Sequence, residues 1–390
     1  MAGTLRVAVI GAGIGGLAAA CALRQRGFEI AVYERAPELG EVGAGLQLGP
    51  NAVKVLRALG VADALKHLAF EPVNIVSLGW DDARLRFREP LKAVAAAKFG
   101  APYWTAHRAD VHRLLCETLP AVRLAAHCTR ASSANGGAVA GFADGTEIEA
   151  DVIIGADGIN SAVRESLFGL QPARYTQQMA WRCIVPIGCV PTRVGPGVEI
   201  GRDEYVGWLG PDGHVICYPI RRGEIYNIFA GHVSEEWVDE SWVVPSSVAE
   251  LLAGYRGWNE ALLEMLGQVE QCFKWGIRDR DPLPHWTRDR IALLGDAAHP
   301  MMPTLAQGAA MALEDAVALA RHLDRHRADP ERGLQAYEAE RLPRARSVQL
   351  QARQQFQNNR RSPPPPPLSR DWIFAHDATV DATADAMMQD

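Results

Sequence analysis

The chain has little cysteine, and its cysteines do not form the patterns of a disulfide scaffold or a zinc site. Seven occur among the 390 residues, at positions 21, 116, 128, 183, 189, 217 and 272. The number is odd, and no two of them have CxxC spacing. These features indicate a protein of the reducing cytoplasm, and we predict that it binds no metal.

Long apolar runs and an excess of positive charge are also absent. No run approaches the roughly 18 apolar residues that a membrane span needs. The segment VAVIGAG already begins at residue 7, which leaves no room for a cleavable signal. A formal net charge of −6 argues against nucleic acid or an anionic membrane as the main partner. The composition, 48% hydrophobic and 22% charged, is that of an ordinary soluble globular protein.

The first 35 residues have the pattern of a β-α-β unit. LRVAVI at 5–10 is a continuous apolar run, as expected for a parallel strand that is buried on both faces. Residues 14–26 are rich in Ala and Leu, which predicts a helix ending at Gly27. FEIAVYE at 28–34 predicts the second strand. We therefore predict an α/β fold with a Rossmann-type lobe.

The pattern changes twice farther along the chain. Residues 51–66, with Asn51 as cap and a glycine interruption at residue 60, predict a helix. Residues 108–118 predict another, and 121–154 predict a meander with a hairpin turn at Asp144-Gly145. From about 173 to 280, segments rich in Trp, Val and Tyr alternate with turns. This alternation predicts a second lobe built on an antiparallel sheet. RIALLG at 290–295 again has the continuous apolar pattern of the first lobe's strands, and it precedes a predicted helix from about 307 to 323.

The C-terminal part is predicted to contain a charged helix over 331–360, a polyproline II spacer at Pro363–Pro367 and a tail that includes DWIFAHDA. The length suggests one large domain with a second lobe. We predict that residues 1–172 are the first part of the nucleotide-binding domain and 173–280 the antiparallel-sheet domain. Residues 281–325 would return to the first domain, and 326–390 would form the C-terminal helix, spacer and tail.

The turn after the first strand reads Gly11-Ala12-Gly13-Ile14-Gly15-Gly16, which is GxGxxG between a strand and a helix. Gly11 allows the tight turn, Gly13 lets the backbone approach a pyrophosphate, and Gly16 lets helix and strand pack closely. The helix N-terminus offers free N–H groups to the phosphates. Glu34, at the end of the second strand, can accept both ribose hydroxyls. The motif predicts a bound dinucleotide but does not separate NAD from FAD.

Two later motifs distinguish between these cofactors. GADGINSAVR at 155–164 and GDAAHP at 295–300 each follow a strand end. Together with the glycine motif, they resemble the FAD-dependent aromatic hydroxylases, the single-component flavoprotein monooxygenases. The segments most similar to the salicylate, 3-hydroxybenzoate and 6-hydroxynicotinate hydroxylases are GAGLQLGPNA at 43–52, HRADVHRLL at 107–115, DAAHPMMPTLAQGAAMALEDA at 296–316 and DWIFAHDA at 371–378.

The resemblance implies FAD as bound cofactor, NADH or NADPH as transient co-substrate, and O2, with oxygen transferred through a flavin C4a-hydroperoxide. Asp296 is expected to bond the ribityl chain, and the helix opening near Gly308 to present its positive end to the N1 edge of the flavin. Arg164 belongs to the same motif as Asp157, and His299 is expected to be structural. The residues predicted to contact FAD are Gly11, Gly13, Ile14, Gly15, Gly16, Glu34, Arg35, Gln47, Arg108, Cys128, Asp157, Asp296, Gly308, Ala309 and Ala310.

The chemistry of phenol hydroxylation calls for a base. A phenolate is richer in electrons at its ortho and para carbons than a phenol, and a base that titrates near neutral pH favours His. In GHVICYPI at 213–220, residues 214, 216 and 218 project from one face of a strand. The His-x-x-x-Tyr spacing resembles the substrate pair of the 3-hydroxybenzoate and 6-hydroxynicotinate hydroxylases. We predict His214 as the base and Tyr218 as its hydrogen-bonding partner at the substrate.

The opposite wall of the substrate pocket is predicted at Met302, Pro303 and Thr304, while the positions of Arg182 and Arg221 cannot be predicted. The expected function is therefore that of an FAD-dependent, NAD(P)H-consuming monooxygenase that hydroxylates a small phenolic acid, as a monomer or homodimer. A halogenase or reductase of the same fold is one alternative, although WRCIVP at 181–186 does not closely match a halogenase motif. A non-catalytic FAD-binding protein is the other. The particular acid, and whether decarboxylation accompanies hydroxylation, stay open.

Overall fold

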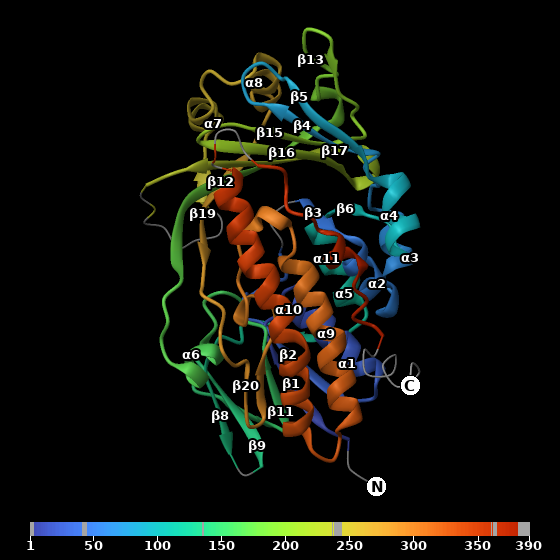
Figure 1. Ribbon diagram of the computed structural model, residues 1–390. Coiled ribbons are helices and arrows are strands. Elements are labelled where there is room, and N and C mark those ends of the chain that lie inside the picture. The colour runs from blue at the N-terminus through green and yellow to red at the C-terminus, as the bar shows by residue number, and fades with distance from the viewer. Residues whose placement is uncertain are drawn as a thin grey trace.

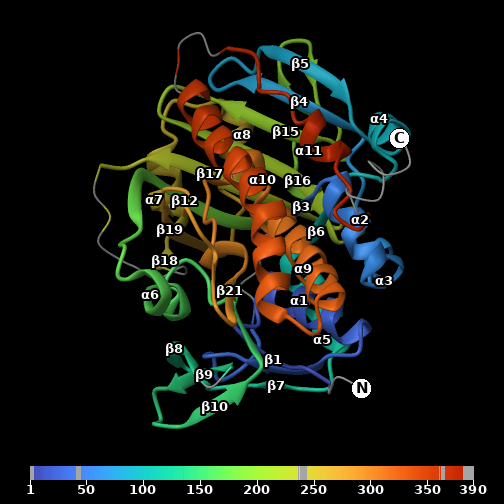
Figure 2. The same ribbon diagram turned by 60° about the horizontal axis from the view of Figure 1, so that its bottom comes forward.

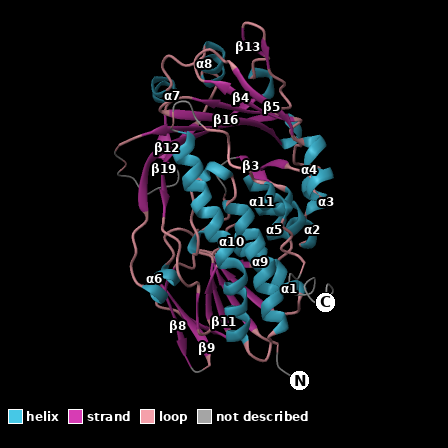
Figure 3. Cartoon of the chain, viewed as in Figure 1, coloured by secondary structure: helices cyan, strands magenta, loops and turns pink. Residues whose placement is uncertain are grey.

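The computed structural model describes residues 4–40, 45–134, 136–235, 237, 244–359, 361 and 365–380. Its strands gather in two groups at opposite ends of the molecule, and most of the long helices lie between them (Figure 3). In Figure 1 the larger sheet lies at the top, while the N-terminal sheet lies below it and behind the helices. The two groups correspond to the two lobes that the sequence predicts.

The N-terminal lobe is built on a six-stranded sheet. Its order is β20 (Thr287–Arg288), β21 (Ile291–Leu293), β11 (Val152–Gly155), β1 (Arg6–Ile10), β2 (Glu29–Tyr33) and β7 (Val122–Arg123). All neighbours pair in parallel except β20 with β21. The central strands are apolar because both of their faces are buried. The predicted β-α-β unit is confirmed by β1, α1 (Ile14–Gln25) and β2.

The second lobe is built on an eight-stranded sheet. Its order is β18 (Val244–Ser246), β19 (Cys272–Asp279), β12 (Arg174–Pro186), β17 (Ile225–Val233), β16 (Gly213–Ile220), β15 (Tyr205–Leu209), β4 (Asn74–Gly79) and β5 (Leu85–Pro90). The prediction is wrong in one respect: the sheet is not confined to residues 173–280 and is not wholly antiparallel. Strands β4 and β5 come from within residues 1–172, and β4 pairs with β15 in parallel.

Three smaller sheets complete the strand inventory of the described residues. The predicted meander is a three-stranded sheet of β8 (Cys128–Ala134), β9 (Gly137–Phe142) and β10 (Glu147–Ala150). Its second hairpin turns at Gly145, whose φ of +85° favours glycine. The two-stranded sheets are β13 (Arg193–Gly195) with β14 (Val198–Glu199) and β3 (Gly45–Leu48) with β6 (Trp104–His107).

The helices of the N-terminal lobe converge on α9 (Gly308–Arg325), which lies between α1 and α10 (Pro330–Asn359) in both views of the ribbon (Figures 1 and 2). The other helices are α2 (Pro50–Ala58), α3 (Ala62–Lys66), α4 (Lys92–Phe99), α5 (Arg108–Glu117), α6 (Ala162–Phe168), α7 (Val248–Gly254), α8 (Glu260–Leu266) and α11 (Asp371–Ala375), with short 3-10 turns at Ile187–Cys189, Arg221–Gly223, Gly295–Ala297 and Pro303–Leu305. No helix in the described part of the chain is long and apolar enough to span a membrane.

Two predictions about helices need correction. The helix predicted over 51–66 is two helices, α2 and α3, because Gly60 between them has a φ of +78°. Asn51 is not its N-cap: Gly49 holds that position and Pro50 begins the helix. The amide of Asn51 instead points into the core, where it is fully buried. The spacer predicted at Pro363–Pro367 lies partly outside the described residues.

Candidate active site

A cavity of about 390 Å³ lies where the two lobes meet. One side consists of residues from the eight-stranded sheet, and the other consists of the GxGxxG turn, the segment 294–306 and the start of α9. The predicted site residues that line it are Gly13, Ile14, Gly15, Gln47, Arg108, His214, Tyr218, Asp296, Met302, Pro303, Thr304, Gly308 and Ala309. Segments from nearly the whole length of the sequence thus meet at one site.

Strand β16 supplies the sheet side of the cavity through alternate residues. His214, Ile216 and Tyr218 all line it, whereas Val215 and Cys217 are fully buried in the core on the other face of the sheet. This is the two-residue period of a β-strand. The predicted common face of positions 214, 216 and 218 is therefore confirmed.

The imidazole of His214 is held between two neighbours on β17. It stacks on Phe229 with ring centroids 5.5 Å apart, and it lies across Gly231. A Cβ atom on Gly231 would come within 2.6 Å of the His214 Cε1 atom, so only glycine allows this placement. Burial lowers the pKa of His214 to about 4. At neutral pH the ring is therefore uncharged and can accept a proton or a hydrogen bond.

Tyr218 lies at the other end of the same wall, in a group of tyrosines. Its ring stacks on Tyr205 with centroids 5.8 Å apart and parallel planes, and its hydroxyl would be 2.7 Å from a Cβ atom on Gly45. Burial raises the pKa of Tyr218 far above its usual value, so its hydroxyl keeps its proton and remains a donor. Gln47 accepts a hydrogen bond from Tyr103 at 2.6 Å, which ties the predicted flavin contact into this group.

The GxGxxG turn has the geometry that a dinucleotide requires. Gly11 has a φ of +105°, and a Cβ atom on Gly16 would lie 2.0 Å from the Gly11 carbonyl oxygen. Both glycines are therefore required by packing, as predicted. At Gly13, by contrast, a Cβ atom would meet nothing within 4 Å. The open space lies at the N-terminus of α1, where no side chain caps the helix and phosphates are favoured.

Asp296 and α9 face the cavity from the opposite side. Burial raises the pKa of the Asp296 carboxyl, and the charges of His299 and Arg108 oppose that rise. No hydrogen bond to this carboxylate occurs within the described ranges, so it is available to a hydroxyl group of a ligand. Gly308 begins α9 without a side-chain cap, and a Cβ atom there would also meet nothing within 4 Å. An uncapped helix start facing open space suits an anionic ring edge.

These observations fit FAD: open space over Gly13 suits its pyrophosphate, the unpartnered Asp296 its ribityl hydroxyls, and the start of α9 its flavin ring. Glu34 is half-buried and accepts hydrogen bonds from the backbone N–H groups of Ala12 and Ala36. A carboxylate has lone pairs left for a ribose after two such bonds.

Some predicted contacts do not reach the cavity lining. Arg35 is exposed, and Ala310 is fully buried inside α9. Cys128 lies on β8 with its thiol directed at the Arg130 carbonyl, and burial raises the pKa of that thiol to about 11. Asp157 accepts hydrogen bonds from Ser161 and from the Val163 N–H. Ser161 is the N-cap of α6, and Asp157 supports it by accepting from its hydroxyl and from a free N–H of the first turn.

His299 is structural, and its partner is a side chain rather than the local backbone. It is 1% exposed, and its Nε2 atom lies 2.5 Å from Asp315 Oδ2. Asp315 also accepts from Arg341 Nε at 2.9 Å and from the Gly295 N–H at 3.2 Å. His299 thus joins the strand end that carries Asp296 to α9 and α10 without facing the cavity.

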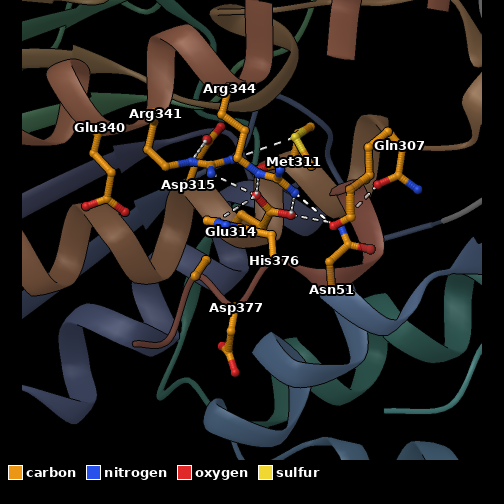
Figure 4. Close-up of polar contacts among 12 residues, drawn as sticks. Asn51, Gln307, Met311, Glu314, Asp315, Glu340, Arg341, Arg344, His376 and Asp377 are labelled. Atoms are coloured by element: carbon orange, nitrogen blue, oxygen red, sulfur yellow. Dashed lines mark hydrogen bonds and ion pairs between the residues drawn. The ribbon is translucent and has the colours of Figure 1, made fainter. Parts of the chain in front are cut away.

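A second carboxylate, Glu314, extends this buried charge network along α9 (Figure 4). Arg344 donates to both of its oxygens at 2.7 and 2.9 Å, and the amide of Asn51 donates to Glu314 at 2.7 Å and to Gln307 at 3.0 Å. Burial would raise the pKa of Glu314, but the charges of Arg341 and Arg344 lower it overall. Because Gln307 immediately precedes α9, the network fixes the helix end that faces the cavity.

Thr304 lines the cavity, but its hydroxyl donates to the Ala352 carbonyl of α10 at 2.6 Å. The hydroxyl proton is therefore committed to the protein and does not serve as a donor to substrate. Ala306, two residues later, has a φ of +54°, which is unfavourable for a residue with a Cβ atom by about 1 kcal/mol. Strain of this kind is common in loops that are held in place at functional sites.

Among the residues that the structure describes, the charged ones that line the cavity are four arginines, Arg108, Arg182, Arg278 and Arg370, and one aspartate, Asp296. Arg182 stacks on Trp275, with its guanidinium carbon 3.6 Å from the ring centroid. Arg221 is not part of this group, because it pairs with Asp110 at 3.2 Å. A cavity with this excess of guanidinium groups favours anionic ligands.

A second cavity, of about 280 Å³, shares Trp275 and Arg278 with the first and also contains Arg164 and Arg280. Arg164 is 3% exposed, and burial, with the nearby charge of Arg280, lowers its pKa to about 10. Buried nitrogens of both side chains, Nε of Arg164 and Nη1 of Arg280, have no hydrogen-bond partner in the described part of the chain. Glu165, which is exposed, also lines this cavity. The unsatisfied buried donors of Arg164 and Arg280 are unfavourable unless an anion or another acceptor joins them.

Several cavity residues were not foreseen from the sequence. Tyr205, Phe229 and Trp275 lie on strands whose alternation resembles that of any half-buried sheet, so no local signal marks them. Arg182 was noted but could not be placed. Arg370 follows the proline-rich segment, where no periodic pattern relates it to the cavity.

Comparison with known proteins places this geometry among known relatives. Residues 4–352 match the family model described as FAD binding domain. The chain is 42% identical over 351 residues to 3-amino-4-hydroxybenzoate 2-monooxygenase PtnB3 of Streptomyces platensis, covering 90% of this chain and 87% of that protein. It is 39% identical over 355 residues to 6-hydroxynicotinate 3-monooxygenase of Bordetella bronchiseptica, covering 90% and 91%. A salicylate hydroxylase in complex with substrate has a similar structure, with a TM-score of 0.82, 28% identity and coverage of 99% and 98%.

Proposed function

This chain belongs to the FAD binding domain family, among the FAD-dependent aromatic monooxygenases, and on that premise we propose that it hydroxylates a small phenolic aromatic acid. FAD is its cofactor, with NAD(P)H and O2 as co-substrates, as the sequence predicts. Family membership favours this function over a halogenase, a reductase or a non-catalytic FAD-binding protein.

When bound and reduced, FAD supplies the activated oxygen atom that the aromatic ring receives. The residues of this chain orient the ring and adjust its charge. His214 is uncharged at neutral pH, so it accepts the proton of the phenolic hydroxyl. A phenolate beside the imidazole would in turn raise the pKa of His214, because an opposite charge favours the protonated ring. Tyr218, which keeps its proton, donates a hydrogen bond to the substrate.

The observation that carries the choice of an acid is the charge of the cavity, whose described lining contains four arginines and one aspartate. A neutral phenol would gain little from this excess of positive charge. A carboxylate would gain directly, and a phenolate formed beside His214 would be stabilised as well. The relatives named for 3-amino-4-hydroxybenzoate and 6-hydroxynicotinate act on molecules of this class.

A panel of aromatic acids tests the proposal. We expect 3-amino-4-hydroxybenzoate, 6-hydroxynicotinate, 3-hydroxybenzoate or salicylate to stimulate NADH oxidation by the FAD-containing protein, with a hydroxylated product identified by mass spectrometry. The matching phenols without a carboxylate should be poor substrates. Peroxide must be measured in parallel, since uncoupled oxidation also consumes NADH. Hydroxylation of neutral phenols in preference to every acid would refute the proposed substrate class.

The second cavity supports a proposal about the nicotinamide donor. Among the described residues, buried nitrogens of Arg164 and Arg280 have no hydrogen-bond partner, and the cavity shares a wall with the flavin cavity through Trp275 and Arg278. We propose that the phosphates of NADH bind there transiently, with Arg280 as one of their partners. NADH rather than NADPH remains a proposal that rests on family resemblance.

Replacing Arg280 with glutamine should raise KM for NADH about 10-fold, since a charge-assisted hydrogen bond is lost. KM for the aromatic acid should remain within about 2-fold, because Arg280 does not line the first cavity. Arg288→Gln is the matched control, since Arg288 stacks on Phe168 and lines neither cavity. Steady-state kinetics with each substrate varied in turn provides the measurement, and equal effects of the two variants would argue against the site.

We further propose that the protein acts in the cytoplasm as a monomer or homodimer. All seven cysteines are free thiols, which suits a reducing compartment. Light scattering of the purified FAD-containing protein would distinguish monomer from dimer.

A further inference from the structure

The segment DWIFAHDA, residues 371–378, docks on the N-terminal lobe beside α2 (Figures 1 and 2). We call the described residues 365–380 the C-terminal strap. Its backbone carbonyls accept hydrogen bonds from three long side chains of the lobe. Arg344 donates to the Ile373 carbonyl at 3.0 Å, Lys54 to that of Ala375 at 3.0 Å, and Arg321 to that of Ala378 at 2.5 Å. The strap is thus attached along its length rather than at one point.

An aromatic pocket holds the side chain of Phe374. Its ring makes edge contacts with Phe99 and Tyr103, with centroids 5.6 and 5.9 Å apart. The ring also lies against the backbone of Gly49, where a Cβ atom would come within 2.7 Å of Phe374. The glycine that precedes α2 therefore admits the strap, and the pocket fixes the position of the residues next to Phe374.

The charge network of α9 also reaches the strap (Figure 4). Arg344 makes the connection, because it binds both Glu314 and the Ile373 carbonyl. His376 Nε2 lies 3.7 Å from Glu314, which is too far for a hydrogen bond, and burial lowers the pKa of His376 to about 4. The same carboxylate that holds the cavity end of α9 therefore helps to hold the strap. The flavin wall and the strap share one buried support.

Arg370 is the strap residue that reaches the cavity. Its guanidinium carbon lies 5.2 Å from the centroid of the Phe374 ring, and its charge opposes the rise that burial causes in the pKa values of Tyr103 and Tyr205. Tyr103 donates to Gln47, and Tyr205 next to it stacks on Tyr218. Arg370 therefore belongs to the tyrosine end of the cavity, opposite the end at which His214 lies.

Two of the other cavity arginines have competing partners: Arg108 acts on the charge of Asp296, and Arg278 is shared with the second cavity. Arg182 stacks closely on Trp275 and its charge acts on Tyr218, so it is the rival of Arg370 that the test must separate. For Arg370, no carboxylate forms an ion pair within the described part of the chain, and its neighbours are a phenyl ring and a phenol. A guanidinium in neutral surroundings has its charge and its paired N–H donors free for a carboxylate.

The geometry of the wall gives the substrate a direction. His214 and Tyr218 are four residues apart on β16, which is about 13 Å at ~3.3 Å per residue. Side chains that project from both ends shorten this span toward the length of a hydroxylated aromatic acid. An acid whose hydroxyl faces His214 therefore presents its carboxylate to the end of the cavity where Tyr205, Tyr218 and Arg370 lie.

We propose that Arg370 binds the carboxylate of the aromatic acid, and that the C-terminal strap is a specificity-determining wall of the substrate pocket. This inference rests on the proposed function. It gives the DWIFAHDA segment a role: its docking places the residue immediately before it in the cavity. Removing the charge of Arg370 should weaken binding of acids and leave binding of their neutral counterparts almost unchanged.

The test measures ligand binding to the oxidised, FAD-containing protein, from the change in the flavin absorption spectrum and without turnover. Arg370→Gln should raise Kd for 3-hydroxybenzoate and 6-hydroxynicotinate about 10- to 100-fold, the range expected for a charge-assisted hydrogen bond. Kd for the corresponding carboxamides should change less than about 3-fold. Arg370→Lys keeps the charge without the paired donors and should give an intermediate Kd.

Two further variants make the outcome decisive. Asp371→Asn removes the exposed ion pair with Lys98 and should bind acids like the wild type. That result would show that disturbing the strap surface is not enough to weaken acid binding.

If Arg182→Gln weakens acid binding while Arg370→Gln does not, the carboxylate binds to Arg182 and the proposal for Arg370 is refuted. If Arg370→Gln loses FAD, the comparison of Arg370→Lys with the wild type decides, and equal acid affinities refute the proposal. Wild-type protein that binds none of the acids would overturn the proposed function itself.

Discussion

Replacing His214 with alanine should lower turnover of the aromatic acid by about 10²- to 10⁴-fold, the usual contribution of a general base. FAD should stay bound, because His214 lies on the sheet wall and not on the GxGxxG side of the cavity. The phenolic proton would then have no acceptor, and the ring would react as a poorer nucleophile. Rapid-mixing measurement of product formation in a single turnover separates this step from reduction by NADH.

The pH dependence adds a second readout. An ordinary histidine loses its acceptor capacity as the pH falls through about 6.5, whereas burial lowers the pKa of His214 to about 4. The wild-type kcat/KM should therefore show no histidine limb between pH 5.5 and 7.5. Phe229→Leu, which removes the stacking partner but keeps the base, serves as the control and should retain most of the activity. Near wild-type hydroxylation by His214→Ala across this range would show that another group is the base.

Replacing Gly13 with valine should weaken FAD binding by on the order of 100-fold, since inserted bulk in a closely packed contact costs about 1–3 kcal/mol. A Cβ atom there meets no atom of the described residues within 4 Å, so we expect the protein still to fold. The space it fills is the space over the N-terminus of α1 where we place the pyrophosphate. Flavin content after purification, and fluorescence quenching on titration with FAD, give the measurement.

Gly188→Val is the matched control, because a Cβ atom on Gly188 also meets nothing within 4 Å and this residue lies outside both cavities. It should retain FAD, and both variants should melt cooperatively without added flavin. Gly16→Ala provides a contrast, since its Cβ atom would clash with the Gly11 carbonyl oxygen and should destabilise the fold itself. A Gly13→Val protein that binds FAD like the wild type would show that the phosphates lie elsewhere.

Local sequence patterns were sufficient to predict features that depend on a single strand, helix or turn. The apolar run of β1, the glycine turn and the alternation in β16 each follow from the period of a single strand or helix, and the structure has all three. The two-residue period is also why His214 and Tyr218 could be placed on one face without any knowledge of the partner strands.

Contacts between distant segments could not be predicted in this way. Nothing within residues 74–90 indicates that β4 will pair with β15, because pairing depends on the partner strand as much as on the strand itself. Asparagine is a residue type that favours helix N-caps, yet the amide of Asn51 is a buried hydrogen-bond donor to Glu314. The structural role predicted for His299 did not identify its partner, which is an aspartate sixteen residues later. In each case the sequence did not identify the distant residue that becomes the partner.

The residues that pack against the GxGxxG turn affect the order in which the protein folds and takes up flavin. Gly15 packs so closely on α9 and the strand before it that a Cβ atom would lie 2.8 Å from Leu294 and 3.0 Å from Ala312. The GxGxxG motif is therefore synthesised within the first residues of the chain, but the segments that pack against it are synthesised much later. Contacts over such long separations form slowly, because the intervening loop must first be closed. Flavin uptake is then a late event, and the yellow colour of the protein reports a finished fold rather than a folded N-terminal unit.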